Sequence, residues 1–256
     1  MKVNCVMSES EVGAHQSLLR ELRAEDSATR FLAVLHRFAQ LYQHPALLTG
    51  NAEDRSVGEL IAQSSKLQSL LETLHAIRAR REKVIIFARH RAMQGILAKV
   101  LQEEFQLPAR IINGETKLRA GSLRTKGVKT RTAILDDFRA TPGFNLLILS
   151  PFVAGIGLTV VEANHVVHFG RWWNPAVEAQ ATDRAYRIGQ TKEVTVHLPI
   201  LHDPSGRVSP SFDERLDDLM ERKQRLADDF LRPLPPEAEM GSELFTDLKA
   251  EARRQD

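Results

Sequence analysis

Short apolar runs separated by helical patterns are the feature that most restricts the fold of this chain. Residues 84–88 (VIIFA) form a run rich in β-branched side chains, which is typical of a strand buried on both faces. Further strands are predicted at residues 109–112, 145–149, 165–169 and 194–198. Helical spacing at residues 91–105 and 132–139 separates them. Strands that alternate with helices require right-handed crossovers, so the sequence predicts an α/β fold with a parallel sheet covered by helices on both faces.

Composition is consistent with one globular core plus appendages, since 43% of the 256 residues are hydrophobic and 27% are charged. Basic residues exceed acidic ones by only 35 to 33, so net charge alone predicts no nucleic-acid partner. The single cysteine, Cys5, excludes an internal disulfide. The first residues lack the apolar segment of a signal peptide, and Pro151, Gly155 and Gly157 interrupt the apolar stretch 146–161. We therefore expect a cytoplasmic protein without a membrane span.

The segment 171–190 (RWWNPAVEAQATDRAYRIGQ) contains the most specific pattern in the chain. Its Asn-Pro pair suits the cap and first position of a helix. If that helix continues to Gly189, then Gln180, Arg184 and Arg187 share one face at i, i+4 and i+7. Two guanidinium groups beside an amide suit a triphosphate, because arginine binds phosphate oxygens with two N–H groups and keeps its charge. A solvated helix face is the alternative, but the small alanines and Gly189 favour a site.

This segment closely resembles motif VI of the Swi/Snf-type ATPases, a branch of helicase superfamily two. The family pattern is WWNP followed by Gln-x-x-Asp-Arg-x-x-Arg-x-Gly-Gln, which the chain matches at residues 172–175 and 180–190. The resemblance implies a RecA-like fold and the C-terminal helicase lobe of a DNA-dependent ATPase of bacterial type. It also implies that Arg184 and Arg187 are arginine fingers that, with Gln180, reach the γ-phosphate of ATP held by another lobe. The nucleotide-binding residues expected from the resemblance are Gly155, Gly157 and Asp183.

Two nucleotide-binding elements are absent from the sequence. No segment reads G-x-x-x-x-G-K-[ST], and no apolar strand ends in an Asp-Glu pair that would hold magnesium. We therefore expect this chain to be the second lobe of a two-lobe motor, with ATP and Mg²⁺ held mainly by an N-terminal helicase lobe. Alone, the chain should hydrolyse ATP poorly or not at all, and we predict no metal site in it.

Polar segments follow three of the predicted strands, at the edge where parallel sheets carry their functional loops. Arg89 and His90 match the family's motif IV, although a solvated basic turn is an equal alternative for them. Gly114 and Thr116 match a Gly-x-Thr element that contacts a DNA phosphate in relatives. Ser150 opens motif V, residues 150–159, and can offer its hydroxyl to a phosphate. Such contacts would position the protein on DNA without reading its sequence.

Two departures from the family pattern stand out. In motif V, relatives carry a basic residue and later an asparagine, whereas this chain has Pro151, Phe152, Ala154 and Thr159. An insertion of roughly ten residues follows the Gly-x-Thr element and makes segment 117–131 basic, with no acidic residue. Its basic residues, which we predict to contact the DNA backbone by electrostatic attraction, are Lys117, Arg119, Arg124, Lys126, Lys129 and Arg131. A loop kept soluble by its charge is the alternative.

The chain is predicted to divide into four parts. Residues 1–65 resemble the helical connector that follows the first motor lobe, and residues 66–201 form the RecA-like lobe. Residues 202–236 resemble a brace helix, and residues 237–256 form a tail that we expect to be partly disordered. Trp172 and Trp173 are interpreted as packing residues rather than base-stacking residues. His165 and His168 lack Cys or carboxylate neighbours in the sequence, which makes metal binding improbable.

Three functions compete at this stage. The favoured one is the second lobe of an ATP-dependent translocase that tracks duplex DNA and associates with the nucleoid when bound. A non-catalytic nucleic-acid-binding or protein-interaction module with the same fold is the second. An RNA helicase lobe is the third, although the Swi/Snf-type WWNP and Arg-Ile-Gly-Gln strings argue against it. No oligomer is implied.

Overall fold

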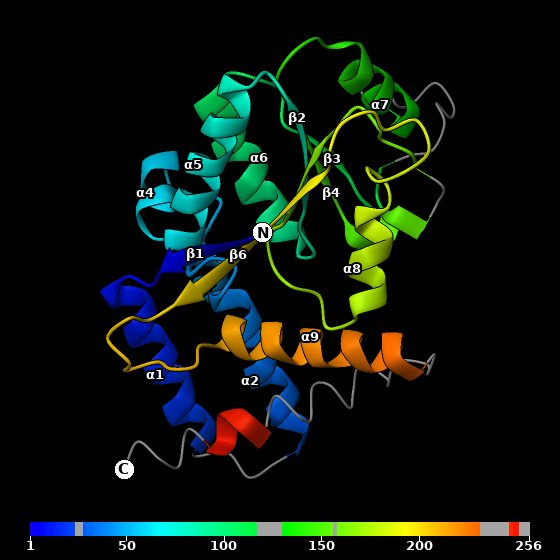
Figure 1. Cartoon of the computed structure of the whole chain (residues 1–256). Coiled ribbons are helices and arrows are strands. Elements are labelled where there is room, and N and C mark those ends of the chain that lie inside the picture. Colours follow the sequence, from blue (N-terminus) through cyan, green and yellow to red (C-terminus); the bar gives the residue numbers. More distant parts are fainter. Residues whose placement is uncertain (24–27, 117–129, 156–157, 231–245, 251–256) are drawn as a thin grey trace. The chain divides into compact units, whose positions relative to one another are not determined.

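The computed structural model describes residues 1–23, 28–116, 130–155, 158–230 and 246–250 (Figure 1). The chain forms two compact units. We call Met1 with residues 70–170 and 176–198 the sheet unit, and residues 2–69, 171–175 and 199–256 the helical unit. The strands form a six-stranded parallel sheet in the order β1-β6-β5-β2-β4-β3, which confirms the predicted RecA-like α/β class.

The sheet unit alternates strands and helices as the sequence predicts. In chain order its elements are α5 (Ser65–Ala79, which begins in the helical unit), β2 (Lys83–Phe87), α6 (Arg91–Phe105), β3 (Arg110–Ile112), α7 (Arg131–Ala140), β4 (Asn145–Leu149), the 3₁₀ turn η1 (Pro151–Gly155), β5 (His165–His168), α8 (Pro175–Thr182) and the start of β6 (Thr195–His202). Strand β2 lies between β4 and β5, with Lys83 opposite Asn145 and Val84 opposite His165. All five residues of β2 are buried, as a β-branched central strand requires.

The core of the sheet unit joins strand side chains to α7 and to the region of α8. Ile85, Leu147 and Val166 from three neighbouring strands belong to the same buried cluster as Ile134 and Phe138 of α7. Complete burial of such a side chain stabilises the fold by about 1.5–3 kcal/mol. This packing fixes α7 against the sheet, which matters below because both ends of α7 carry arginines.

The helical unit contains a strand that the sequence did not predict. Its elements are β1 (Lys2–Val6), α1 (Glu9–Arg23), α2 (Ala28–Leu41), α3 (Ala46–Thr49), α4 (Val57–Ala62), the start of α5, the end of β6 and α9 (Phe212–Phe230). The predicted helical connector therefore begins with β1. The backbone N–H of Met7 donates to the carbonyl oxygen of His202 at 2.9 Å. Pairing with a segment almost 200 residues away leaves no local pattern in the sequence, which explains the missed strand.

Three helices of the helical unit start with a reciprocal cap. In each, a serine side chain accepts the backbone N–H of a glutamate three residues later, and that glutamate accepts the serine backbone N–H. The pairs are Ser8 with Glu11, Ser56 with Glu59, and Ser211 with Glu214. Glu11 also accepts the Ser65 hydroxyl at 2.7 Å, so one carboxylate joins the starts of α1 and α5.

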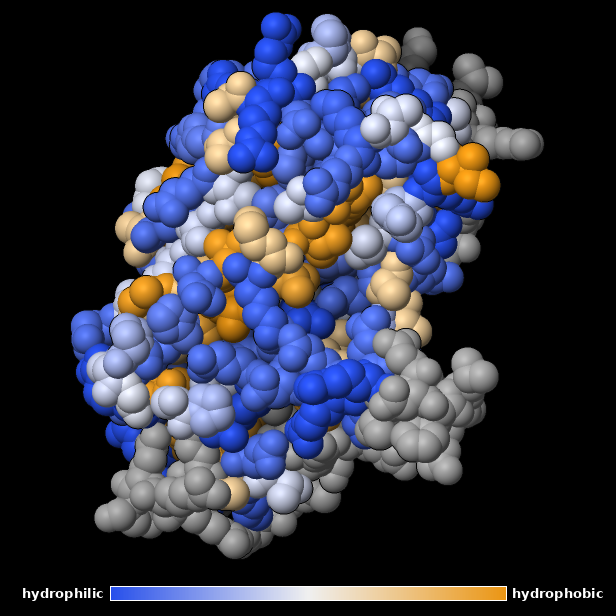
Figure 2. All heavy atoms as spheres, viewed as in Figure 1, coloured by the Kyte–Doolittle hydropathy of each residue, from blue (hydrophilic) through white to orange (hydrophobic). Residues whose placement is uncertain are grey.

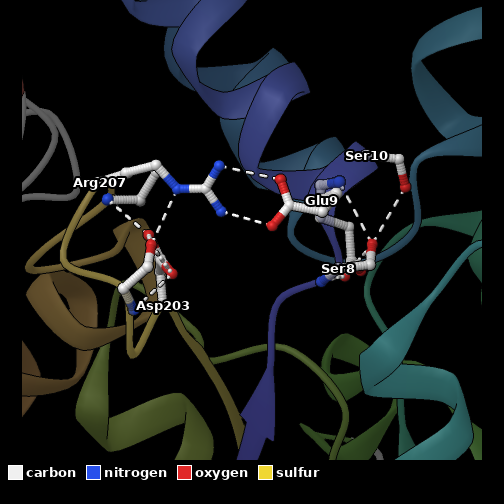
Figure 3. A network of polar contacts seen from close by, with 8 residues as sticks. Ser8, Glu9, Ser10, Asp203 and Arg207 are labelled. Carbon is white, nitrogen blue, oxygen red and sulfur yellow. Dashed lines mark hydrogen bonds and ion pairs between the residues drawn. The ribbon is translucent and has the colours of Figure 1, made fainter.

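A polar contact ties the loop after β6 to the start of α1 (Figure 3). The Arg207 guanidinium donates to both carboxylate oxygens of Glu9, at 2.9 and 2.6 Å. Asp203 accepts the backbone N–H of Ser205 and the backbone N–H of Val208, both at 2.9 Å, which shapes the same loop. This bidentate pair lowers the pKa of the Glu9 carboxyl from its ordinary value.

Both tryptophans contribute to packing, which confirms that interpretation. Trp172 is 3% exposed. Trp173 packs against the core of the helical unit, with its ring centroid 6.0 Å from that of Phe212. Phe212 and Leu216 place the inner face of α9 in that core.

Hydrophilic side chains cover most of the face seen in Figure 2, and hydrophobic ones appear only in small groups. Among the described residues, no helix combines the length and the apolar character that a membrane crossing needs. The predicted tail at 237–256 lies outside the described residues except for 246–250.

Candidate functional site

The two predicted finger arginines lie beyond the end of α8. That helix begins at Pro175, as expected, but ends at Thr182, so the prediction that Gln180, Arg184 and Arg187 share one helix face is wrong. The N–H groups of Arg184 and Ala185 bond to carbonyl oxygens three residues earlier, at 3.2 and 3.0 Å. Such tightened turns are typical of a helix terminus. We call residues 183–190 the finger segment.

The finger segment is held by the stretch that leads into β5. The backbone N–H of Val160 donates to the carbonyl oxygen of Arg184 at 2.8 Å. The Gln190 side-chain amide donates to the carbonyl oxygens of Val161 and Ala163, at 2.9 and 2.8 Å. We call residues 158–164 the return segment, because it leads back to the start of β5. These tertiary bonds compete with helix continuation, which local sequence patterns do not reveal.

The two arginines are placed differently. Arg187 is exposed, and its Nη1 donates to the Thr159 hydroxyl at 2.8 Å. Arg184 is half-buried, and its Nε is buried without a hydrogen-bond partner in the described structure. Within the ranges that the structure describes, neither guanidinium is within ion-pair distance of a carboxylate. Two positive charges therefore lie on one segment, and no acidic side chain among the described residues neutralises them.

Arg139, near the end of α7, also contacts the return segment. Its Nη2 donates to the carbonyl oxygen of Thr159 at 2.8 Å, and its Nε lies 3.4 Å from a carboxylate oxygen of Glu162. Lys83 fixes the same end of α7 by donating to the carbonyl oxygens of Phe138 and Arg139, at 2.6 and 2.9 Å. Because Lys83 is the first residue of β2, the finger segment lies toward the amino ends of the strands.

A second polar network lies at the carboxyl ends of the strands, in the turn 113–116 that we call the strand-end turn. Gln94, which is 1% exposed, donates to the carbonyl oxygen of Ala88 at 2.8 Å. Its side-chain oxygen accepts the Asn113 side-chain amide at 2.9 Å. The helix after β2 and the turn after β3 are therefore held together by a buried glutamine.

Thr116 and Arg131 complete the strand-end turn. The Thr116 hydroxyl accepts the Asn113 N–H at 3.1 Å and donates to the carbonyl oxygen of Ile111 at 3.3 Å. Arg131, the first residue of α7, donates to the carbonyl oxygens of Thr116 and Asn113, at 2.7 and 3.1 Å. Arg131 is 5% exposed, so its grouping with the basic DNA-contacting loop is wrong: it shapes the turn from inside.

Four of the predicted DNA-contacting residues meet at this edge. The Ala88 N–H donates to the Leu149 carbonyl oxygen and the Ser150 N–H to that of Ile112, both at 3.0 Å, so the ends of β2, β4 and β3 adjoin. The residues brought together there are Arg89, which is exposed, His90, which is half-buried, Gly114, which is exposed, and Ser150, which is 7% exposed.

The remaining predicted site residues have few described contacts. Gln180 and Asp183 are exposed, and in the described structure their side chains form no hydrogen bond or ion pair. Gly155 ends η1. Outside the described residues lie Gly157, Lys117, Arg119, Arg124 and Lys126.

Sequence reasoning missed a chain of titratable groups at the amino ends of β2, β5 and β6. His165 contacts a Glu82 carboxylate oxygen at 2.7 Å and the His197 ring at 3.1 Å, and Lys192 donates to Glu82 at 3.1 Å. The hydrogen bond from His165 lowers the pKa of Glu82 to about 2. Burial lowers the pKa of His197 to about 4. Partners this far apart in sequence give no motif.

His168 contacts the Thr182 hydroxyl at 2.9 Å, so it also has a structural partner. In the part of the chain that the structure describes, no three His, Cys, Asp or Glu side chains form a group that could hold a metal ion.

Comparisons with known proteins identify the family of this chain. Residues 65–189 match the family model of the helicase conserved C-terminal domain. Zorya protein ZorD of Escherichia coli is 40% identical over 212 residues, which are 82% of this chain and 18% of that protein. YwqA of Bacillus subtilis, whose name describes an ATP-dependent helicase or translocase, is 36% identical over 78% of this chain and 20% of its own length. The chain thus spans about a fifth of the length of these relatives.

A solved structure gives the same result. The SWI2/SNF2 ATPase core domain of Sulfolobus solfataricus superposes with a TM-score of 0.70 at 25% identity, over 94% of this chain and 46% of that one. The predicted resemblance is confirmed: this chain belongs to the SWI2/SNF2 family of ATPases, in which it corresponds to the helicase C-terminal domain.

Proposed function

We propose that this lobe supplies Arg184 and Arg187 as arginine fingers to ATP held by an N-terminal lobe, in a motor that tracks duplex DNA. The observation that carries the proposal is the state of the two guanidinium groups. Arg187 is exposed and anchored through one N–H, Arg184 has a buried Nε with no described partner, and no described carboxylate neutralises either group. We assign their remaining N–H donors to a ligand that another lobe holds.

A triphosphate fits this donor set. Arg184 is half-buried and no described carboxylate neutralises its charge, so a phosphate that reaches the exposed part of the side chain would be attracted to it. The fork of Arg187 keeps donors free after its bond to Thr159 and matches the spacing of phosphate oxygens. Bound ATP supplies the phosphoryl group that is transferred to water. The arginines stabilise the charge that develops on that group, an effect worth about 10³–10⁵ in rate in related enzymes.

The other nucleotide contacts belong to the same proposal. Gln180 and Asp183 lie exposed at the end of α8 and start of the finger segment, within reach of a ligand there. Gly155 and Gly157 carry no side chain that would keep a ligand from the backbone. The phosphate-cradling loop and Mg²⁺ are assigned to the N-terminal lobe, because the chain has no G-x-x-x-x-G-K-[ST] segment. This chain covers 46% of the Sulfolobus core domain, so the remainder of that domain is long enough to contain such a lobe.

The DNA backbone is proposed to lie along the carboxyl ends of β2, β3 and β4. Arg89 and Gly114 are exposed there, and His90 and Ser150 adjoin them. Thr116 contributes by shaping the turn, because its hydroxyl is already bonded within it. Cationic and N–H donors of this kind bind phosphates without reading bases, which a translocase requires. The basic residues at 117–126 are proposed to extend this surface.

The finger role is tested in the full-length protein by Arg187→Ala. We expect the turnover number for ATP with duplex DNA to fall by about 10³-fold or more, since a charge-stabilising group is lost. Binding of duplex DNA should stay unchanged, because the DNA-contacting residues follow the strands at the other end of the sheet. Arg20→Ala, which removes an exposed arginine of α1 in the helical unit, serves as a matched control and should leave turnover unchanged.

Two outcomes would contradict the proposal. One is turnover by Arg187→Ala within a few fold of the wild type. The other is substantial ATP hydrolysis by this chain without an N-terminal lobe. Comparing stimulation by duplex DNA and by RNA in the same assay separates a DNA translocase from an RNA helicase.

A further inference from the structure

Thr159 lies between two arginines: its hydroxyl binds one, and its carbonyl oxygen binds the other. Its hydroxyl accepts a hydrogen bond from Nη1 of Arg187 at 2.8 Å. Its carbonyl oxygen accepts one from Nη2 of Arg139 at 2.8 Å. One residue thus links the end of α7 to the finger segment. The family resemblance expects asparagine at this position, so the residue that makes the contact departs from the shared pattern.

We propose that Thr159 is a positioning residue that orients the Arg187 guanidinium, and that Arg139 holds Thr159 in place. The inference rests on the proposed finger role of Arg187. An exposed arginine has many rotamers, and fixing it before the reaction avoids that loss of freedom in the transition state. The neutral hydroxyl of Thr159 suits the task, because it restrains Arg187 through one N–H group without neutralising the charge that the phosphate needs.

Several further contacts hold the return segment, which contains Thr159. Arg139 approaches Glu162 at 3.4 Å as well as Thr159, so it clamps both halves of the return segment. Lys83, at the start of β2, bonds the carbonyl oxygens of Phe138 and Arg139 and so fixes the end of α7 to the sheet. The N–H of Val160 donates to the Arg184 carbonyl oxygen. Val160 therefore holds the backbone of Arg184, so two consecutive residues of the return segment contact both proposed finger arginines.

Three substitutions in the full-length protein test the hydroxyl. Thr159→Val keeps the size and branching but removes the acceptor. We expect the turnover number with duplex DNA to fall about tenfold, the order expected for one hydrogen bond to a charged group, while KM for ATP changes less than about twofold. Thr159→Ser retains the hydroxyl and should recover most of the lost turnover. Arg139→Met should lower turnover by about threefold, again with KM for ATP changed by less than about twofold.

A double variant separates positioning from a general structural role. In the Arg187→Ala background, Thr159→Val should cause no further loss, because the hydroxyl acts only through the missing guanidinium. Thermal unfolding of each variant verifies that the fold is retained. A full additional tenfold loss in that background, or equal losses for Thr159→Val and Thr159→Ser, would overturn the positioning role.

The same set of variants keeps the two proposals distinguishable. If Arg187→Ala has no effect on turnover, the finger proposal itself fails. If Arg187→Ala is strongly impaired while Thr159→Val matches the wild type, only the positioning inference fails.

Discussion

The two polar regions of the sheet unit differ in how deeply their arginines are buried. In the strand-end turn, Gln94, Thr116 and Arg131 bond to one another's backbone or to neighbouring carbonyl oxygens. In the finger segment, one guanidinium is exposed and the other has a buried N–H without a described partner. Arg131 also has a buried N–H group without a described partner, at Nη1, so an unsatisfied N–H group does not by itself distinguish the two regions. We call the first region finished because its arginine is held inside the fold, and the second incomplete because it presents arginine charge at the surface.

Helix α7 connects the two regions. Arg131 at its first residue holds the strand-end turn, and Arg139 near its last residue holds Thr159. Eight residues of helix separate these arginines by about 12 Å. The two arginines thus have different roles. Arg131 is 5% exposed and holds the strand-end turn inside the fold, whereas Arg139, whose side chain is 38% exposed, holds Thr159 near the surface. The contrast between finished and incomplete regions predicts which substitutions harm stability and which harm only activity.

The largest effect on stability is expected from Arg131→Met. It removes a buried cation, leaves the carbonyl oxygen of Thr116 without its Arg131 donor and leaves that of Asn113 with only the Thr116 N–H group, so the free energy of unfolding should fall by about 2–4 kcal/mol. Arg187→Met, the matched change in the finger segment, should alter it by less than about 0.5 kcal/mol, because that side chain is exposed. Urea unfolding of both variants measures the difference. Equal destabilisation would remove the distinction between the regions.

An intermediate effect is expected from acidification. His197 at the amino ends of the strands contributes to it, together with His15 and His44, whose pKa values burial also lowers. Burial lowers the pKa of His197 to about 4, from 6.5. Unfolding then takes up a proton at mildly acidic pH, so the stability that neutral His197 contributes is present above about pH 6.5 and is lost as pH falls toward 4. Between pH 7 and 5 the loss should be on the order of 1 kcal/mol.

His197→Gln checks this assignment, because it removes the titrating ring and should flatten the decline in urea midpoint over the same range. Glu82 acts only at lower pH. Its pKa in the folded state is about 2, so its contribution is complete above about 4.5 and is lost below that value. An unchanged slope in His197→Gln would place the pH sensitivity elsewhere, for instance in the other histidines.

The sequence predicted the sheet unit well because its signals are local. The run at residues 145–149 and the helix at residues 91–105 match the observed bounds, since a buried strand and a packed helix each leave their own hydrophobic period. What it missed depends on long-range bonds. Strand β1 exists through pairing with β6, and α8 stops at Thr182 while Gln190 bonds the return segment.

The candidate site shows the same division. The identities of Arg184 and Arg187 were readable as a motif, but their placement on turns was not. Thr159 was visible only as a departure from the family pattern, and its hydrogen bond to Arg187 spans 28 residues of sequence. Arg131 was misjudged because a basic residue beside a basic loop resembles a phosphate contact until its burial is known.

The smallest effect is expected at the edge of the strand-end turn, where Glu115 pairs with Arg91. Both side chains are about two-thirds exposed, at 66% and 68%, so the pair should contribute less than about 1 kcal/mol to stability.

Glu115→Gln removes a negative charge beside Gly114 and releases Arg91 toward a phosphate. If this finished surface meets DNA, affinity for duplex DNA should rise about two- to threefold at low salt and return to the wild-type value at high salt, because exposed charges are screened there. Fluorescence anisotropy with a labelled duplex measures the change, and Glu72→Gln on α5 is a control that removes an exposed charge away from this turn. Unchanged affinity at low salt would mean that the DNA path does not follow the ends of β2 and β3, and the two regions would then differ in the burial of their arginines without differing in ligand.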